Sequence, residues 1–205
     1  TFDINATGPF TLFGREHELV VGATSQSSRQ TGATFDSSEY RVLSESIFDW
    51  NGNYPRPDFP KNGKYETNQN QNSAYIAARF KPADDWSIIL GSRLSDFQYN
   101  STYRYYQQSS NFQDNKTSAK QHGEVTPYAG VVYDINENYS VYGSYTSIYK
   151  PLTEQSRSGA TLAPTEGNSY ELGVKAEYFD GRLNASAAVF RTEQKNVPIQ
   201  VGTNA

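Results

Sequence analysis

The sequence predicts an all-β fold, namely part of the wall of an antiparallel transmembrane β-barrel, with about eight strands present. Apolar and polar side chains alternate strictly; Leu172 and Val174 share one face of their strand, whereas Glu171 and Lys175 share the other. Short turns also alternate with long polar connections, as in outer-membrane barrels. Finally, a mean hydropathy of -0.75 accompanies 16 tyrosines. A barrel wall explains all three observations, because only every second strand residue must face lipid.

The expected strands cover residues 2–12, 17–26, 73–81, 86–99, 124–134, 139–149, 169–177 and 182–194. The first strand is assigned because alternation is present from the first residues onward. Short connections at 13–16, 82–85, 135–138 and 179–181 are rich in the Gly, Pro, Asp and Asn that turns require. The remaining connections, 27–72, 100–123 and 150–168, are long and polar, which predicts extracellular loops.

Each later strand has one apolar face, which we expect to contact the bilayer. These faces hold Trp86, Ile88, Leu90 and Leu94; Val125, Ala129, Val131 and Tyr133; Tyr170, Leu172, Val174 and Ala176; and Leu183, Ala185, Ala187 and Val189. Ile89 departs from the pattern, since it falls on the polar face. Trp86, Tyr133, Tyr139 and Phe179 lie beside the short turns, where a periplasmic aromatic girdle would lie, although β propensity alone also favours aromatic residues in strands.

Composition excludes several classes of function. The chain of 205 residues has no cysteine, which removes disulfides, thiolate catalysis and most zinc or iron–sulfur sites. A net charge of -4 disfavours binding to nucleic acid, because such proteins concentrate Lys and Arg. No apolar run reaches the length that a transmembrane helix needs. The first residues lack a secretion signal, and the last ones lack an aromatic-terminated closing strand, so we expect an internal fragment.

An ordered set of residues between positions 142 and 196 resembles the late-barrel signature of the TonB-dependent ferric-siderophore receptors of Gram-negative outer membranes. The set consists of Tyr142, Ser144, Tyr145, Thr146, Tyr149, Pro151, Leu162, Pro164, Gly167, Tyr170, Glu171, Gly173, Lys175, Gly181, Leu183, Ala187, Phe190 and Asn196. Thr165 departs from the family pattern, because it separates Pro164 from Glu166. Residues 47–55 resemble an extracellular loop of the hydroxamate-type receptors for coprogen, ferrioxamine or pyoverdine.

The resemblance implies an antiparallel barrel of about 22 strands, crossing the outer membrane many times, with a plug domain inside. Residues 1–205 would belong to the barrel domain, with the plug and the C-terminal strands outside this chain. The receptor would bind a ferric siderophore and import it with energy from TonB–ExbB–ExbD, which acts through the plug. Because the siderophore's own oxygens would hold the iron, we expect no cofactor and no protein metal ligand. We also expect no enzymatic activity, since the sequence has no convergent acid and base, no nucleophile elbow and no Gly-rich phosphate loop.

The first candidate ligand-binding group lies in the connection 27–72. Trp50, Tyr54 and Arg56 combine aromatic surface with a positive charge, which suits an anionic iron chelate with a planar organic scaffold. Loops of this length are usually functional or disordered. The alternative is that Trp50 only folds the loop onto itself.

Two further groups lie in the other long connections. Tyr103 and Tyr105 would share a face if the strand continued upward, where they would contact a polar ligand in the lumen or form an outer aromatic girdle. Gln155 and Arg157 have little aromatic surface around them, so a solvated loop is the main alternative to a role in ligand binding.

Other classes of function remain open from sequence alone. His17 and His122 are expected at opposite ends of the barrel, so they cannot share a catalytic site. His122 near Glu124 is better explained as a solvated pair than as an acid–base pair. A porin, an adhesin or an enzyme barrel would share the alternation, and a soluble carbohydrate-binding β-sandwich would also place Trp, Tyr and Asn in loops.

Overall fold

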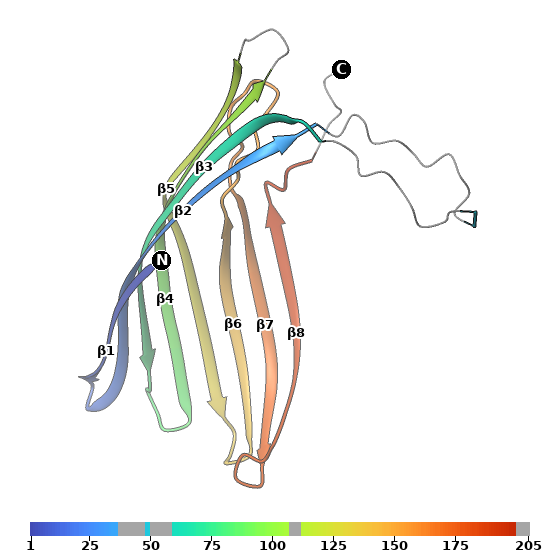
Figure 1. Ribbon diagram of the computed structural model, residues 1–205. Coiled ribbons are helices and arrows are strands. Elements are labelled where there is room, and N and C mark those ends of the chain that lie inside the picture. Colours follow the sequence, from blue (N-terminus) through green and yellow to red (C-terminus); the bar gives the residue numbers. More distant parts are fainter. Residues whose placement is uncertain (37–47, 50–58, 107–111, 200–205) are drawn as a thin grey trace. The chain divides into compact units, whose positions relative to one another are not determined.

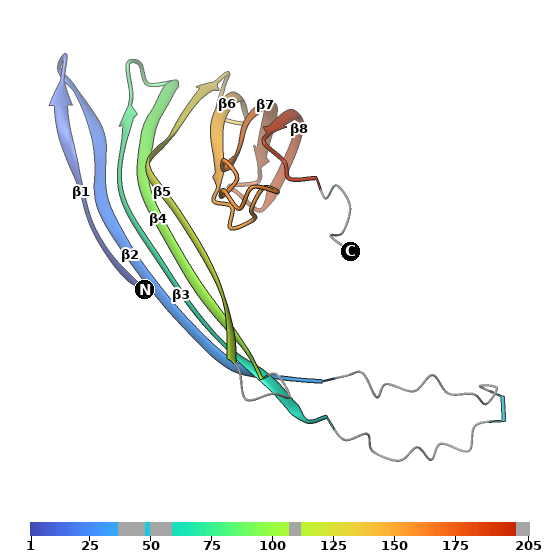
Figure 2. The same ribbon diagram turned by 90° about the horizontal axis from the view of Figure 1, so that it is seen from above.

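The computed structural model describes residues 1–36, 48–49, 59–106 and 112–199. These residues form eight strands and no helix (Figure 1). The strands are β1 (Phe2–Leu12), β2 (Arg15–Phe35), β3 (Lys61–Phe80), β4 (Trp86–Tyr106), β5 (Phe112–Asp134), β6 (Tyr139–Lys150), β7 (Thr165–Tyr178) and β8 (Leu183–Lys195). They make one sheet in the order β1 to β8, so consecutive strands are hydrogen-bonded neighbours (Figure 2). The predicted all-β class and the number of strands are confirmed.

The chain divides into two compact units. Unit 1 comprises residues 1–27, 70–99 and 118–205, and unit 2 comprises residues 28–69 and 100–117. Strands β2 to β5 contribute to both units, and unit 2 holds their ends next to the connections 36–60 and 107–111. We call this end of each strand the loop side, and the end with the tight connections the turn side. The 151–164 connection is also on the loop side.

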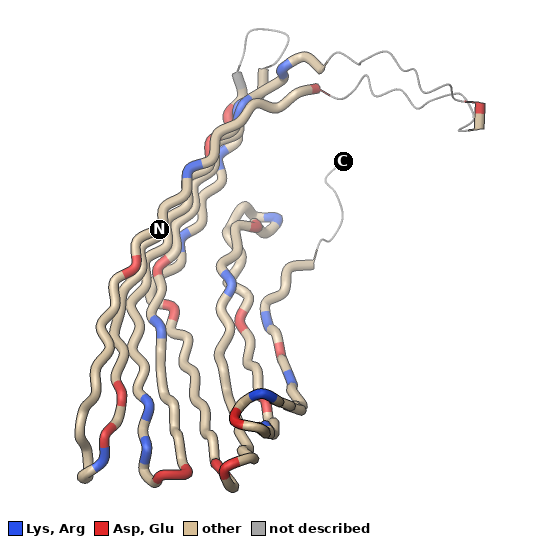
Figure 3. Tube along the Cα trace, turned by 60° about the horizontal axis from the view of Figure 1, so that its bottom comes forward, with Lys and Arg blue, Asp and Glu red and all other residues tan. Residues whose placement is uncertain are grey.

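The turns fix how neighbouring strands align on the turn side. Leu12 pairs with Arg15, which leaves a two-residue loop, and both loop residues have positive φ, 52° at Phe13 and 75° at Gly14. This is the type I′ geometry, whose twist matches that of the flanking strands. Between β7 and β8, Phe179, Asp180 and Gly181 also have positive φ. Figure 3 shows acidic residues at the turns between β3 and β4 and between β5 and β6.

The two faces of unit 1 differ as the alternation predicts. Leu172 pairs with Gly143 on the apolar face, and one step along the strands Gly173 pairs with Tyr142 on the polar face. Apolar side chains on the first face remain open to the surroundings; on β7 the exposed fraction is 63% for Leu172 and 49% for Val174. On the other face, polar side chains of different strands hydrogen-bond to one another. The facing assignment is therefore confirmed, and one face suits lipid while the other suits water.

Polar contacts link strands across that second face. Arg93 on β4 donates to Oγ1 of Thr24 at 2.9 Å and to Oγ of Ser73 at 2.8 Å, which joins β2, β3 and β4. Among the described residues the buried hydrophobic ones are only Phe97, Ala119 and Leu152. Since little apolar surface is enclosed, the backbone hydrogen bonds between strands must provide much of the cohesion of the sheet in lipid.

The predicted aromatic girdle lies on the turn side. The rings of Trp86 and Tyr133 are 4.8 Å apart, and the rings of Tyr139 and Tyr178 are 5.8 Å apart and nearly perpendicular. Phe179 follows directly in the next turn and is 66% exposed. These pairs place amphipathic rings at one level, as expected at a membrane interface.

His17 is a buried member of the same turn-side region. It is 6% exposed, and its ring packs 5.3 Å from the ring of Phe10 and 5.6 Å from that of Phe80. Its Nδ1 accepts the backbone N–H of Lys81 at 2.9 Å, so Nε2 is the atom left to donate to the carbonyl oxygen of Leu12 at 3.1 Å. The ring therefore joins β1, β2 and the end of β3.

The predicted loop-side boundaries of four strands are wrong. β2 continues to Phe35 and β3 begins at Lys61, so the connection between them is 36–60 rather than 27–72. β4 continues to Tyr106 and β5 begins at Phe112, so the expected long connection at 100–123 is reduced to 107–111. Both faces of these strand ends are polar, which hides the alternation, whereas the backbone pairing continues. No described helix is long and apolar enough to span a membrane.

Candidate functional site

Tyr103 and Tyr105 lie near the loop-side end of β4 rather than in a loop. Their ring centroids are 4.1 Å apart. The hydroxyl of Tyr103 donates to Oγ1 of Thr34 on β2 at 2.7 Å, and Thr34 donates in turn to Oδ1 of Asn62 on β3 at 2.8 Å. These bonds hold the half-buried Tyr103 ring in place, whereas the ring of Tyr105 is 40% exposed. The pair therefore combines an anchored ring with an accessible one.

A third phenol ring lies in the same unit. A Cβ added to Gly32 on β2 would lie less than 3.0 Å from the ring of Tyr65 on β3. Two residues further along β3, the hydroxyl of Thr67 is 3.0 Å from that of Ser101 on β4. The two-residue period of each strand puts Tyr65 with Thr67, and Tyr103 with Ser101. Unit 2 thus presents a wall of phenol rings and hydroxyls, which can stack on an organic ring and hydrogen-bond to polar groups.

The opposite face of unit 2 is charged. Arg104 donates from Nε and Nη2 to both carboxylate oxygens of Asp114, at 2.6 and 2.8 Å. These hydrogen bonds hold the pKa of Asp114 below its usual range. A hollow of about 660 Å³ beside Arg104 is lined also by Lys61, Lys64 and Glu66. Because adjacent residues of β4 point to opposite faces, the rings of Tyr103 and Tyr105 and this charged hollow are on different sides of the strand, whereas Tyr65 on β3 also lines the hollow.

Gln155 and Arg157 lie on a small hairpin within the 151–164 connection. Gln155 forms a β-bridge with Thr161, and the backbone N–H of Ser156 donates to the carbonyl of Ala160 at 2.8 Å. Thr161 ties the hairpin to β5 by donating to the carbonyl of Ser118 at 3.0 Å. Gln155 and Arg157 themselves are exposed. The solvated loop weighed in the sequence analysis is thus an ordered hairpin with accessible side chains.

Trp50, Tyr54 and Arg56 lie outside the described residues. The structure therefore does not test this group. Sequence reasoning missed Thr34, Asn62 and Tyr65, because it assigned all three to the long loop. Residues 61–72 show no apolar–polar alternation, so the signal that could have found part of this group is the β propensity of Tyr65 and Thr67.

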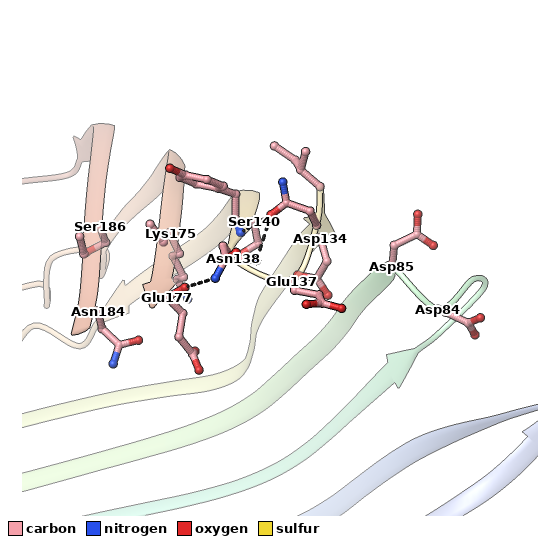
Figure 4. A pocket seen from close by; sticks show the side chains of 15 residues that line it. Asp84, Asp85, Asp134, Glu137, Asn138, Ser140, Lys175, Glu177, Asn184 and Ser186 are labelled. Carbon is pink, nitrogen blue, oxygen red and sulfur yellow. Dashed lines mark hydrogen bonds between the residues drawn. The ribbon is translucent and has the colours of Figure 1, made fainter. Parts of the chain in front are cut away.

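A second hollow lies at the turn side of unit 1. It has a volume of about 810 Å³, and Figure 4 shows the carboxylates of Asp84, Asp85, Asp134, Glu137 and Glu177 around it, together with Lys175. Asn138 donates to the backbone carbonyl of Glu177 at 2.7 Å, which fastens the turns together. This excess of negative charge disfavours an anionic iron chelate.

One of the acidic turn residues is neutralised by a neighbouring hairpin. Arg15 donates to Asp84 at 2.7 Å, and this hydrogen bond lowers the pKa of that carboxyl. The carboxylate is therefore ionised throughout the neutral pH range, and the pair links the turn before β2 to the turn before β4.

No catalytic arrangement is present among the described residues. Nδ1 of His122 lies 3.3 Å from Oδ1 of Asp96, so its partner is Asp96 and not Glu124; both side chains are more than half exposed. The expected position of His122 at the end of the barrel is wrong, because it lies in the middle of β5. The two histidines still have different surroundings, since His17 packs against Phe10 and Phe80. Among the described residues, no group of three or more His, Asp or Glu side chains is arranged to hold a metal ion.

The family model described as "TonB dependent receptor-like, beta-barrel" matches residues 1–205. The chain belongs to the TonB-dependent receptor β-barrel family. This membership confirms the resemblance found in the sequence and places the chain in the outer membrane as part of a strand-built barrel. It also decides against the carbohydrate-binding sandwich and the enzyme barrel, because the family consists of receptors.

Several ferric-pyoverdine receptors are similar to this TonB-dependent receptor chain. The ferric-pyoverdine BN7/BN8 receptor of Pseudomonas putida is 38% identical over 96% of the chain and 25% of that protein. The ferripyoverdine receptor of Pseudomonas aeruginosa is 36% identical over 96% of the chain and 23% of that protein. The chain thus spans about a quarter of the length of these relatives.

Solved structures support the fold. The ferripyoverdine receptor of the outer membrane of Pseudomonas aeruginosa, bound to ferripyoverdine, matches with a TM-score of 0.78 at 33% identity, over 95% of the chain and 25% of that structure. The alcaligin outer membrane receptor of Bordetella pertussis matches with a TM-score of 0.73 at 28% identity, over 98% of the chain and 30% of that structure. The sheet is therefore a segment of the larger receptor barrel.

Proposed function

We propose that the complete protein is an outer-membrane receptor that binds a ferric siderophore and imports it with energy from TonB. Residues 1–205 form part of the barrel domain, and the plug domain and further strands belong to the complete protein. The single observation that carries the proposal is the match of the whole chain to ferric-pyoverdine receptors at 36–38% identity.

A ferric pyoverdine is the first candidate among hydroxamate-type ligands. Ferric-pyoverdine receptors match 95–96% of the chain, whereas the ferrioxamine B receptor of Salmonella typhimurium is 25% identical over 69% of it. The partners we propose are the TonB–ExbB–ExbD complex, acting through the plug, and outer-membrane lipid.

The geometry of unit 2 supports a binding role for its aromatic wall. Tyr103 is anchored through Thr34, and Tyr105 beside it keeps an accessible ring. Such rings stack on a planar organic group at low entropic cost. We propose that this face of β4 lines the lumen and contacts the organic shell of the siderophore, together with Trp50, Tyr54 and Arg56 from the 36–60 connection and Gln155 and Arg157 from the hairpin. Iron stays bound to the siderophore.

Tyr105→Ala in the complete receptor is expected to weaken binding of a ferric pyoverdine by about 1–2 kcal/mol, because an aromatic contact is lost. Equilibrium titration of the purified receptor measures this. Tyr106→Ala is the matched control, since that neighbour points to the opposite face of β4 and should leave the affinity unchanged. Equal effects of the two substitutions would remove the aromatic wall from the binding site.

Trp50→Ala should weaken the same affinity by at least ~1 kcal/mol, and by ~2 or more if Trp50 is a central anchor. The midpoint of thermal unfolding should stay constant, because Trp50 lies in a connection between strands. Unchanged titration curves for Trp50→Ala and Arg56→Ala would exclude this group from ligand binding. Failure of the unmodified receptor to bind any ferric siderophore in a panel would refute the proposed function itself.

A further inference from the structure

Four strand glycines lie directly under tyrosine rings of a neighbouring strand. A Cβ added to any of these glycines would come within 3.0 Å of the ring, so the ring would have to shift to admit any other residue. The pairs, which we call the Gly–Tyr contacts, are Gly22 with Tyr75, Gly32 with Tyr65, Gly91 with Tyr128, and Gly173 with Tyr142. Each ring therefore lies over the backbone of its glycine, in the space that a side chain at that position would otherwise fill.

The contact between β6 and β7 shows how such a ring is held. Tyr142 and Gly173 are directly opposite in the register. The Tyr142 hydroxyl donates to Oε1 of Glu171, and Nζ of Lys175 lies 4.9 Å from the centre of the same ring. Glu171 and Lys175 are the residues two before and two after Gly173 on its face of β7. The ring is thus bracketed at one position along β7, and a shift of the strands would break all three contacts.

The Gly–Tyr contacts are confined to strand pairs that connect on the loop side. They occur between β2 and β3, between β4 and β5, and between β6 and β7. Among the described glycines, Gly8 has nothing within 4 Å of an added Cβ, and an added Cβ at Gly130 would lie 3.8 Å from its β6 neighbour Gly143. Gly63 and Gly167 approach a turn-joined strand closely, but they meet the backbone carbonyl oxygens of Arg104 and Glu193 rather than a ring. Pairs with a tight turn thus lack the contact, and pairs without one have it.

This distribution has a physical reason. A tight turn fixes the register of the strands that it joins. In the other pairs no tight turn lies near the Gly–Tyr contacts. Gly22 is 13 residues before the end of β2 at Phe35. In β5 the backbone departs from regular strand geometry at Gly123, whose φ is 70°. The connections 36–60 and 151–164 are long, and closing a long segment in a shifted alignment is almost as easy as in the native one, so register errors there cost little locally. The connection between β4 and β5 is short, 107–111, but the irregular backbone at Gly123 lies between it and the Gly91–Tyr128 contact.

We propose that the Gly–Tyr contacts set the register of the three strand pairs joined on the loop side. Tight turns perform this task for the remaining pairs. Ligand-facing connections can then vary in length and sequence without shifting the barrel strands. This assembly role is independent of which ligand the receptor binds.

Introduced cysteine pairs in the complete receptor report the register of β6 and β7. Val141→Cys with Val174→Cys joins directly opposed positions on the apolar face. Val141→Cys with Leu172→Cys becomes opposed only after a two-residue shift, since a diagonal pair is about 7–8 Å apart and beyond the reach of a disulfide. The ratio of the shifted to the native disulfide, measured in folded receptor, is the readout.

Gly173→Ala is expected to raise this ratio roughly fivefold, whereas Gly143→Ala leaves it unchanged, because a Cβ at Gly143 meets only contacts of 3.8–3.9 Å. If Gly173→Ala prevents folding, Tyr142→Leu tests the same contact without a clash. Its matched control is Tyr145→Leu, on the apolar face of β6 and opposite Tyr170. A raised ratio or reduced assembly for Tyr142→Leu alone supports the proposal. Equal ratios and equal assembly for Tyr142→Leu and Tyr145→Leu overturn it.

Discussion

Replacing Val174 with arginine should lower the free energy of unfolding of the complete barrel by about 2–4 kcal/mol if the position lies near the bilayer midplane, where a cation on the lipid face costs that much, and by less nearer the interface. Val174 is 49% exposed and pairs with Val141 on β6 and Ala187 on β8, all on the apolar face. The described partners of Val174 on that face, Val141 and Ala187, carry no carboxylate. The arginine must therefore reach toward the interface or stay unpaired in hydrocarbon.

The measurement is reversible unfolding of the receptor in lipid vesicles. Lys175→Gln is the matched control, because its side chain lies on the polar face beside the Tyr142 ring. The neutral substitution adds no charge next to Glu171, so a loss below about 1 kcal/mol is expected. If Val174→Arg is no more damaging than Lys175→Gln, the assignment of faces is wrong.

His17→Leu should lower the free energy of unfolding by about 1–3 kcal/mol, since it leaves the backbone N–H of Lys81 without its acceptor in a part-buried position. Leucine has a similar size and preserves contact with Phe10 and Phe80, so the loss reports on hydrogen bonding rather than on a cavity. The loss of stability should be greatest in β1, β2 and the end of β3, which the His17 ring joins.

His122→Leu provides the comparison. His122 is more than half exposed and pairs only with the equally exposed Asp96, so its removal should change stability by no more than about 0.5 kcal/mol. The same vesicle assay applies to both variants. A His17→Leu receptor as stable as the His122→Leu receptor would show that water replaces the imidazole at no cost.

Sequence alone predicted the turn side of this sheet well. Where one face meets lipid, the apolar residues at Leu172, Val174 and Val189 mark the strand and its orientation. On the loop side both faces are polar, so Thr31, Asn68 and Thr102 carry no periodic signal although they lie within β2, β3 and β4. The predicted boundaries therefore failed where the hydrophobic pattern ends but the hydrogen-bond ladder continues.

The candidate site was predicted only in part. The shared face of Tyr103 and Tyr105 followed from the period of two, yet their anchor through Thr34 required knowledge of which strands are neighbours. Likewise, the sequence places both Gly173 and Tyr142 on the polar face of their strands. The contact between these two residues, 31 positions apart in the sequence, depends on how β6 and β7 are aligned. Such long-range pairing is invisible to a local pattern.

We propose that the complete protein imports a ferric siderophore with energy from TonB. Uptake of a ⁵⁵Fe-labelled ferric pyoverdine by cells carrying the complete gene, with and without TonB, tests it most directly. We predict that the label accumulates in cells with TonB, whereas without TonB it binds at the surface and stays there. Equal accumulation in the two strains would contradict the account, because the barrel would then act as a passive pore.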